Sequence, residues 1–376
     1  MIEEGMGHNQ VLQGNALEIL KGLPAESVDC VFTSPPYWAL RTYEEASTLW
    51  DGNETCEHQW REAISNSICN KCGAWKGQLG NEPDFNLYIK HLCDIFDEVK
   101  RVMKSTGTCW VNLGDTYYNK AEIKGLSATL PPKSLVQIPA RFSIEMANRG
   151  WILRNKIIWK KTNAMPNSVA DRFTNCYEEI LFFVKSKSYY FNQQFDKREY
   201  PNQKIKDVYK EIVEKTKLKR TRKLEGRKEY AGKTASQAGI QSHSLQTFLA
   251  TLRATGTEVI KLHPDLTKED KEFLQNILHN TAGNVEGRNM RDVWSINTQS
   301  SGKREHYATF GEKLCEIPIN AGCPPNGIIL DPFLGSGTVA VVAQRLGIKW
   351  IGIEISPKYV DIAKKRIKEL QKQVTL

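Results

Sequence analysis

The segment that most constrains the fold lies near the C-terminus, where a glycine turn joins an apolar strand to an apolar helix. The run IILDPFLGSGTVA carries Gly335 and Gly337 in this turn, and the next strand, IKWIGIE, ends at Glu354. Only 22 of the 376 residues follow Glu354, and their pattern predicts a single helix. Such a unit needs further parallel strands beside it. These strands must come from earlier in the chain, which predicts a circularly permuted sheet.

The N-terminal half supplies strands of the required kind. The apolar run VDCVF (28–32) has the pattern of a parallel strand buried on both faces. Residues 10–24 predict a short strand and a helix. We therefore expect an α/β protein with a doubly wound, mostly parallel Rossmann-like sheet and helices on both faces. Further helices are expected over 86–107, 137–150 and 356–373, and further strands over 108–115, 151–161, 177–186, 326–331 and 348–355.

The middle of the chain differs from its two ends. Strand and helix alternation fades between 187 and 292, and the charge rises there. Residues 196–291 hold 20 Lys and Arg against 13 Asp and Glu, which is +7 of the total +9. A basic excess confined to one region indicates a polyanionic partner such as nucleic acid. The expected organisation is 1–186 and 293–376 as two halves of one domain, with 187–292 as an inserted basic region.

The glycine turn has the features of a nucleotide-binding turn. Glycine lets the backbone turn tightly and approach a ligand beside a helix N-terminus. The carboxylate of Glu354, at the end of the next strand, can accept hydrogen bonds from two ribose hydroxyls. Gly335-x-Gly337-x-x-Ala340 also fits a dinucleotide pattern, but a dinucleotide fold continues with further strands after its acidic residue. A turn that binds no ligand is the alternative.

A stiff turn follows the strand VDCVF. It reads TSPPYW and contains Ser34, Pro35, Pro36 and Tyr37. Adjacent prolines neither donate to a β-ladder nor continue a helix, so they hold the neighbouring groups rigidly. The turn therefore presents a hydroxyl, fixed carbonyls and aromatic rings at the end of a buried strand. Alone, this pattern is also compatible with an ordinary strand exit.

Four further side chains have metal-ligand spacing. They are Cys56, His58, Cys69 and Cys72, within a polar stretch over 41–83 that we expect to be irregular. Cys-x-x-Cys-Gly is typical of a zinc knuckle, and four such ligands form a closed, structural Zn²⁺ site. The alternative is a set of reduced side chains on a loop. The chain has nine cysteines and no recognisable secretion signal. This combination favours reduced thiols or metal ligands over disulfides, and it also favours a cytoplasmic location. No apolar run approaches about 18 residues, so no membrane span is expected.

The turn TSPPYW, followed by a basic region and then DPFLGSGT, resembles the amino-group DNA methyltransferases that use S-adenosylmethionine. The resemblance is to their permuted arrangement, in which the catalytic motif precedes the cofactor motif. Residues 306–314 also resemble the family, although Gly311 stands where proline is common. Residues 14–17, GNAL, resemble a Gly-Asp-Ala-Leu turn whose acid meets the cofactor adenine, with Asn15 in place of the acid.

The resemblance implies transfer of a methyl group to the exocyclic amine of a flipped base in duplex DNA. The Ser34 hydroxyl and the Pro35 carbonyl would accept from the amine, while Tyr37, with Trp38 beside it, would stack on the base. Serine in the first motif position is commoner among cytosine-N4 enzymes, which favours N4 of cytosine over N6 of adenine. Carbon-5 methylation is disfavoured because Cys323-Pro324 reverses the order of a Pro-Cys motif. The implied catalytic residues are Ser34, Pro35, Pro36 and Tyr37; the implied cofactor residues are Asn15, Asp331, Phe333, Gly335, Ser336, Gly337, Thr338 and Glu354.

The same resemblance implies double-stranded DNA as the partner, with a cognate restriction endonuclease as a further one, in a bacterial, archaeal or phage-encoded system. Target recognition would lie in the basic insertion, whose candidates for DNA contacts include Arg220, Arg222, Arg227 and Gln237. Three alternatives stay open: adenine-N6 methylation, a zinc-stapled DNA-binding protein without turnover, and RNA as substrate.

Overall fold

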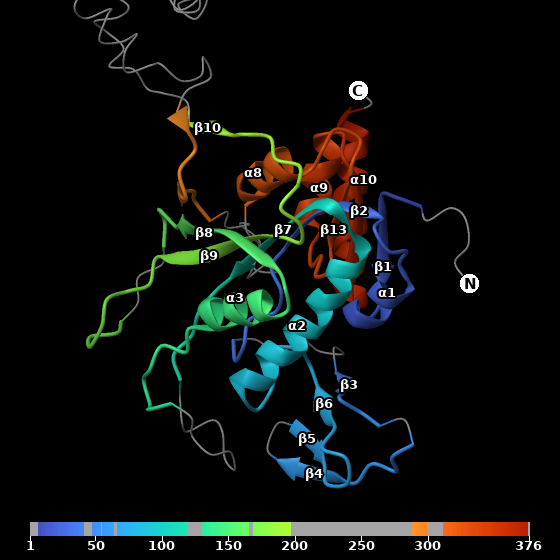
Figure 1. Cartoon of the computed structure of the whole chain (residues 1–376), viewed down its shortest axis with the longest axis vertical. Helices are drawn as coiled ribbons and strands as arrows, with labels where there is room; N and C mark the ends of the chain where they lie inside the picture. The colour runs from blue at the N-terminus through green and yellow to red at the C-terminus, as the bar shows by residue number, and fades with distance from the viewer. Residues whose placement is uncertain are drawn as a thin grey trace, which may run out of the picture. The chain divides into compact units, whose positions relative to one another are not determined.

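The computed structural model describes residues 7–40, 47–53, 55–63, 66–118, 130–164, 168–196, 288–298 and 311–374. Its main feature is an eight-stranded sheet (Figure 1). Within this eight-stranded sheet, β9 alone runs antiparallel to both of its neighbours, and the other pairings are parallel. This confirms the expected mostly parallel α/β fold. In spatial order the strands are β1 (Gln10–Gln13), β14 (Lys349–Glu354), β13 (Ile328–Asp331), β2 (Val28–Thr33), β7 (Met103–Leu113), β9 (Tyr177–Val184), β8 (Ile152–Lys160) and β12 (Val293–Ser295).

The strand order confirms the permutation. The C-terminal strands β14 and β13 lie between β1 and β2, so the two ends of the chain build one continuous sheet (Figure 1). Leu330 of β13 pairs with Val31 of β2 on one side and with Ile351 of β14 on the other. Every residue of β2 is buried, as its apolar run predicts for a central parallel strand.

Helices cover both faces of this sheet. Cys109 and Val111 of β7 belong to the same core as Leu92 and Phe96 of α2. Thr108, the residue before Cys109, points the other way, and its Oγ1 donates to the carbonyl of Gly322 in α8 at 2.9 Å. Neighbouring strand residues therefore face different helices, which is the doubly wound arrangement. The helices of this part are α1 (Ala16–Gly22), α2 (Phe85–Val102), α3 (Ile138–Asn148), α8 (Glu312–Gly322), α9 (Thr338–Arg345) and α10 (Pro357–Val374).

Two expectations from the sequence were wrong in detail. Helix α2 ends at Val102 rather than at Gly107, because Met103 already pairs with Val28 in the sheet. The stretch 41–83 is not simply irregular. It contains a four-stranded antiparallel sheet in the order β3 (Thr48–Trp50), β6 (Trp75–Gly77), β5 (Asn66–Cys69) and β4 (Trp60–Ala63).

The chain divides into two compact units, one of residues 1–194 with 291–376 and one of residues 195–290. Of the second unit, the described part is a short pairing of β10 (Phe195–Asp196) with β11 (Arg288–Asn289) and its immediate surroundings. Arg220, Arg222, Arg227 and Gln237 lie outside the described residues, as does 306–310. None of the helices in the described part of the chain is long and apolar enough to cross a membrane.

One edge of the large sheet collects the chain segments of interest. Strands β1, β14, β13, β2 and β7 are parallel, so their carboxyl ends share this edge. Because β9 is antiparallel, its first residues lie at the same edge, with Glu179 opposite Leu113 at the end of β7. Open α/β sheets bind ligands outside the carboxyl ends of their strands.

Candidate active site and metal centre

The turn from Ser34 to Tyr37 leaves the carboxyl end of β2. Pro35 is buried, whereas Ser34, Pro36 and Tyr37 are partly exposed. The hydroxyl of Tyr88 in α2 donates to the carbonyl of Pro36 at 2.8 Å. Pro35 and Pro36 restrict the backbone of the turn, and the hydrogen bond from Tyr88 attaches the turn to α2.

The phenol oxygen of Tyr37 is the centre of a hydrogen-bond network. It donates to Oε2 of Glu178 at 2.8 Å, accepts from Nδ2 of Asn112 at 2.8 Å, and lies 3.2 Å from Oγ of Ser34. Burial and the nearby Glu178 carboxylate raise the pKa of Tyr37 well above its ordinary value, so the phenol is neutral. Lys161 Nζ bonds the other oxygen of Glu178.

The aromatic rings of the turn have different surroundings. A Cβ atom at Gly114 would lie 2.6 Å from Cε2 of Tyr37, so the close approach of the Tyr37 ring requires glycine there. Trp38 is only 4% exposed, and its Nε1 donates to the carbonyl of Glu82 at 2.9 Å. Trp38 therefore packs in the core and does not add to an open stacking wall, contrary to the expectation from the sequence.

A direct bond joins this turn to the glycine turn. Oγ1 of Thr33, the last residue of β2, donates to Oδ1 of Asp331, the last residue of β13, at 2.6 Å. The same Asp331 oxygen accepts from the backbone N–H of Phe333 at 3.0 Å. Burial raises the pKa of Asp331 to about 7. The Ser34–Tyr37 turn and the glycine turn are far apart in the sequence, but they therefore start next to each other in the structure.

Glycine fits the C-terminal turn for two different reasons. Gly337 has φ +85°, and a Cβ there would lie 2.9 Å from Cβ of Ala363 in α10. Gly335 has φ +53° but faces open space, since the nearest atom to an added Cβ is the Phe333 carbonyl oxygen at 4.0 Å. Gly337 thus serves helix packing, and Gly335 leaves room beside the turn.

Glu354 stabilises the glycine turn from the neighbouring strand. Its Oε2 accepts from the backbone N–H of Gly335 and its Oε1 from that of Ser356, each at 2.8 Å. Burial raises the pKa of Glu354. The two carboxylate oxygens together offer about four lone-pair sites, more than these backbone bonds occupy.

The remaining residues expected at a cofactor site lie close by. Asn15 caps α1, with Oδ1 accepting from the N–H of Leu17 at 2.9 Å, and the preceding Gly14 N–H donates to the Glu354 carbonyl at 2.9 Å. Ser336 and Thr338 are buried and face α10. There, Nη1 of Arg366 donates to the Ser336 carbonyl at 2.8 Å, to the Ser336 hydroxyl at 3.0 Å and to the Thr338 hydroxyl at 3.2 Å. A cofactor role for Ser336 and Thr338 stays a prediction.

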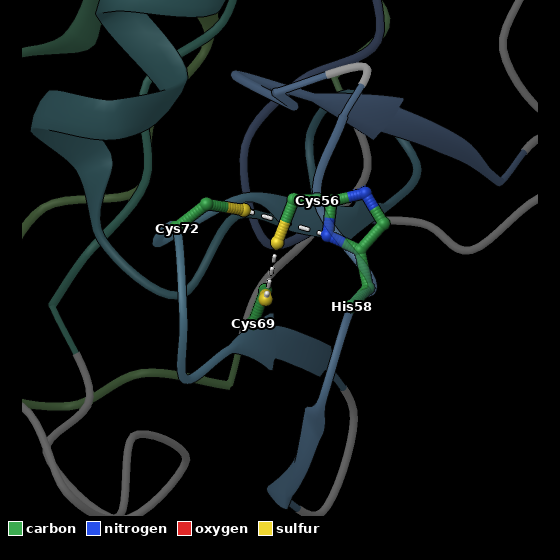
Figure 2. A group of neighbouring side chains, drawn as sticks. All are labelled: Cys56, His58, Cys69 and Cys72. Carbon is green, nitrogen blue, oxygen red and sulfur yellow. Dashed lines mark hydrogen bonds between the residues drawn. The ribbon is translucent and has the colours of Figure 1, made fainter.

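The four expected metal ligands do converge (Figure 2). The ligand atoms of Cys56, His58, Cys69 and Cys72 all lie within 4.8 Å of one another. Sγ of Cys56 and Sγ of Cys69 are 3.9 Å apart, and Sγ of Cys72 is 3.4 Å from Nδ1 of His58. A tetrahedral Zn²⁺ with ordinary bond lengths holds such atoms about 3.5–3.8 Å apart. The donor set and its spacing therefore fit zinc.

The small sheet that carries these four side chains, β3 to β6, is connected to the Ser34–Tyr37 turn. His91 of α2 is fully buried, with Nδ1 3.1 Å from Oε1 of Glu82 and Nε2 3.1 Å from Oδ2 of Asp51. The rings of Trp50 and Trp75 stack on His91, at 4.5 and 5.6 Å between centroids. The Glu82 carboxylate also accepts from the Gly80 N–H at 2.7 Å, and the Gly80 carbonyl accepts from the Ala39 N–H at 2.8 Å.

Several of these site residues escaped the sequence analysis. In the sequence, Thr33 belongs to a strand exit and Asn112 to a strand, and neither position carries a functional signal of its own. Glu178 lies in the strand YEEILFFV, whose polar start carries no functional signal unless the strand direction is known. The antiparallel pairing of β9 with β7 brings Glu178 to the sheet edge where Tyr37 lies.

Comparisons with known proteins agree with this geometry. A family model described as N6_N4_Mtase, DNA methylase, matches residues 28–365. The type II methyltransferase M.SmaI of Serratia marcescens is 29% identical, with 97% of this chain and 93% of that protein covered. The type II methyltransferase M.SfiI of Streptomyces fimbriatus is also 29% identical, with 92% and 88% covered. The structure of PvuII DNA methyltransferase (cytosine-N4-specific) shares the fold, with a TM-score of 0.53, 16% identity, and 97% of this chain and 91% of that chain covered.

Proposed function

Because this chain belongs to the N6/N4 family of DNA methylases, we propose that it transfers a methyl group from S-adenosylmethionine to N4 of a cytosine flipped out of duplex DNA. The observation that carries this proposal is the bond between Thr33 and Asp331. It fixes the Ser34–Tyr37 turn and the glycine turn at one edge of the sheet. The amine-binding group and the methyl donor would then meet there without a covalent intermediate.

The proposed donor site lies along the glycine turn. Gly335 provides the open approach, and the free lone pairs of Glu354 would accept from ribose hydroxyls. Asn15 follows Gly14, whose N–H donates to the Glu354 carbonyl, and would face the adenine of S-adenosylmethionine. Asp331 and Phe333 join the donor site to the catalytic turn. S-adenosylmethionine, when bound there, supplies an activated methyl group on a sulfonium.

The proposed amine site is the Ser34–Tyr37 turn. An exocyclic amine is a poor nucleophile because its lone pair is delocalised into the base. Hydrogen bonds from the amine to the Ser34 hydroxyl and the Pro35 carbonyl would favour a pyramidal nitrogen whose lone pair points at the methyl group. The Tyr88 bond to Pro36 keeps this turn rigid, which is preorganisation. The Tyr37 ring would stack on the flipped base.

Cytosine N4 is preferred over adenine N6 because Ser34 occupies the first motif position. Adenine N6 is the alternative, since a hydroxyl can accept from either amine. The test is mass analysis of nucleosides from unmodified plasmid DNA after incubation with the pure protein and S-adenosylmethionine. N4-methylcytosine supports the proposal; N6-methyladenine replaces it with the alternative.

Two other readings make different predictions in the same assay. A DNA-binding protein without turnover would bind DNA but transfer no label from S-adenosylmethionine. An RNA methylase would be inhibited by competing RNA more strongly than by duplex DNA. For the proposed enzyme, Ser34→Ala should abolish label transfer while DNA binding persists.

The cellular context is proposed from the relatives. M.SmaI and M.SfiI are named as type II methyltransferases. We propose the same role here, in the cytoplasm and with a cognate restriction endonuclease as partner. The basic unit of residues 195–290 would carry target recognition. Long-read sequencing of DNA from cells that express the protein reports both the methylated base and its sequence context.

We further propose that Cys56, His58, Cys69 and Cys72 hold one structural Zn²⁺. All four positions are filled by protein ligands, so the ion would have no open site for chemistry. Elemental analysis of the purified protein should give about one zinc per chain. Cys72→Ser should reduce this content, and Cys176→Ser, which alters a thiol outside the cluster, should not.

A further inference from the structure

The Ser34 hydroxyl has one hydrogen and two lone pairs, and its usefulness to an amine depends on where the hydrogen points. Three polar groups surround the phenol oxygen of Tyr37: Ser34 Oγ at 3.2 Å, Glu178 Oε2 at 2.8 Å and Asn112 Nδ2 at 2.8 Å. The phenol also has one hydrogen and two lone pairs. Counting donors and acceptors therefore decides the direction of every bond.

Glu178 and Asn112 have fixed roles in this network. An ionised Glu178 only accepts, so it takes the Tyr37 hydrogen. The amide nitrogen of Asn112 only donates, with one hydrogen to Tyr37 and the other to Glu178 Oε2 at 2.9 Å. Turning the amide over would place two oxygens against each other, so its orientation is fixed. One lone pair is left on Tyr37, and it faces Ser34.

Lys161 forms an ion pair with Glu178. Its Nζ pairs with Oε1, the oxygen that Tyr37 does not use. The side chains of Lys161 and Glu178 are 23% and 15% exposed, so water screens this pair less than it screens a surface pair. A charge-assisted acceptor of this kind holds the phenol hydrogen firmly.

We propose that Glu178 is a positioning residue that makes Ser34 a permanent acceptor. By taking the Tyr37 hydrogen, Glu178 leaves Tyr37 able only to accept from Ser34. The Ser34 hydrogen then points at Tyr37, and both Ser34 lone pairs stay available for the hydrogens of the target amine. The neutral Ser34 hydroxyl can then only accept from the amine, whereas an ionised carboxylate would be an acceptor without any positioning partner. The inference rests on the proposed function, because it needs an amine as methyl acceptor.

Glu178→Gln tests the proposal with little change in size. The glutamine amide can donate to Tyr37, which frees the phenol hydrogen to turn toward Ser34. We measure single-turnover transfer of labelled methyl groups from S-adenosylmethionine to unmodified plasmid DNA, together with the KM for S-adenosylmethionine and the Kd for DNA. The expected result is a rate loss of about tenfold or more, the value of one hydrogen bond, with KM and Kd unchanged.

Glu179→Gln is the matched control. Glu179 is the next residue and pairs with Lys156 at 3.0 Å, away from this network, so the variant should keep the wild-type rate. Tyr37→Phe is the second test, and it keeps the ring but removes the hydroxyl that connects Glu178 to Ser34. It should lose rate to a similar extent. The double variant Tyr37→Phe, Glu178→Gln should be no slower than the slower single variant.

Three results would overturn the proposal: a wild-type rate for Glu178→Gln or for Tyr37→Phe, losses that multiply in the double variant, or a fall in DNA affinity that accounts for the whole effect. Failure of the proposed function looks different. In that case the wild-type chain itself would leave no methylated amino base in the plasmid, which nucleoside analysis of the same samples detects.

Discussion

The hydroxyl of Thr33 donates a 2.6 Å hydrogen bond to the carboxylate of Asp331, and both residues end central strands of the sheet. Thr33 is fully buried and Asp331 is 2% exposed. This side-chain contact adds to the pairing of β2 with β13 in joining the N-terminal and C-terminal parts of the sheet. Ser34 and the Phe333–Gly337 turn leave the sheet from this point in neighbouring positions.

Thr33→Val should destabilise the fold. Valine has nearly the same shape but, within the described part of the chain, leaves the buried Asp331 carboxylate with only the Phe333 N–H as a hydrogen-bond donor. We expect a loss of about 1–3 kcal/mol in the free energy of unfolding, measured by urea denaturation. Thr48→Val is the control, because the buried Oγ1 of Thr48 has no hydrogen-bond partner in the described part of the chain. Equal losses in both variants would contradict the importance of the Thr33 bond.

Asp331 should make stability depend on pH. Its pKa is raised by burial to about 7, above the value of roughly 3.9 for an unfolded aspartate. Between these values the folded chain holds a proton that the unfolded chain has lost. This contribution is fully present below about pH 4 and is lost as the pH rises through about 7.

The variant Asp331→Asn removes this titration. From about pH 5 to about pH 8, the free energy of unfolding of the wild type should fall relative to that of the variant, by on the order of 2 kcal/mol. Urea denaturation of both proteins across this range measures the difference. A difference that stays constant, or that changes in the opposite direction, would show that the carboxyl titrates elsewhere.

Gly114→Ala should impair catalysis more than folding. An added Cβ would lie 2.6 Å from the Tyr37 ring, so the ring and the Ser34 contact must shift. A displacement of about 1 Å at a reacting group costs up to about a hundredfold in rate, and we expect a loss approaching this in methyl transfer. Gly22→Ala is the control, since an added Cβ there meets nothing within 4 Å. Full activity of Gly114→Ala would mean that the Tyr37 position is not critical.

Removal of the metal should weaken both stability and activity. Metal binding free energy adds to folding free energy where the site exists only in the folded state. The small sheet reaches the catalytic turn through Trp50, His91 and Glu82. We expect chelation to lower the Tm and to reduce the methyl-transfer rate, with recovery of both on addition of Zn²⁺.

The corresponding variant is His58→Ala, compared with Cys176→Ser as a control outside the cluster. The first should reproduce the effect of chelation and become insensitive to chelator, and the second should behave as wild type. If chelation lowers the Tm but leaves the rate unchanged, the small sheet does not support the catalytic turn.

The amino-acid sequence by itself determined the class of fold and the two turns at its centre. Burial on both faces requires a nearly continuous apolar strand, so β2 and β14 stood out, and the permutation followed from the single helix after Glu354. The convergence of the four candidate metal ligands could also be predicted, because Cys and His spacing is a local property. The boundary between α2 and β7 could not, because sheet pairing overrides the local helical pattern at Met103.

Only the tertiary structure decided which side chains contact the Ser34–Tyr37 turn. Glu178 comes from a strand whose antiparallel direction no local pattern reveals, and it meets Tyr37 only because β9 pairs with β7. Trp38 follows Tyr37 directly yet turns into the core. Local sequence determines the tendency of a segment to form a strand or a turn. The partners of a hydroxyl are fixed by contacts between distant segments, and these depend on how the whole sheet is assembled.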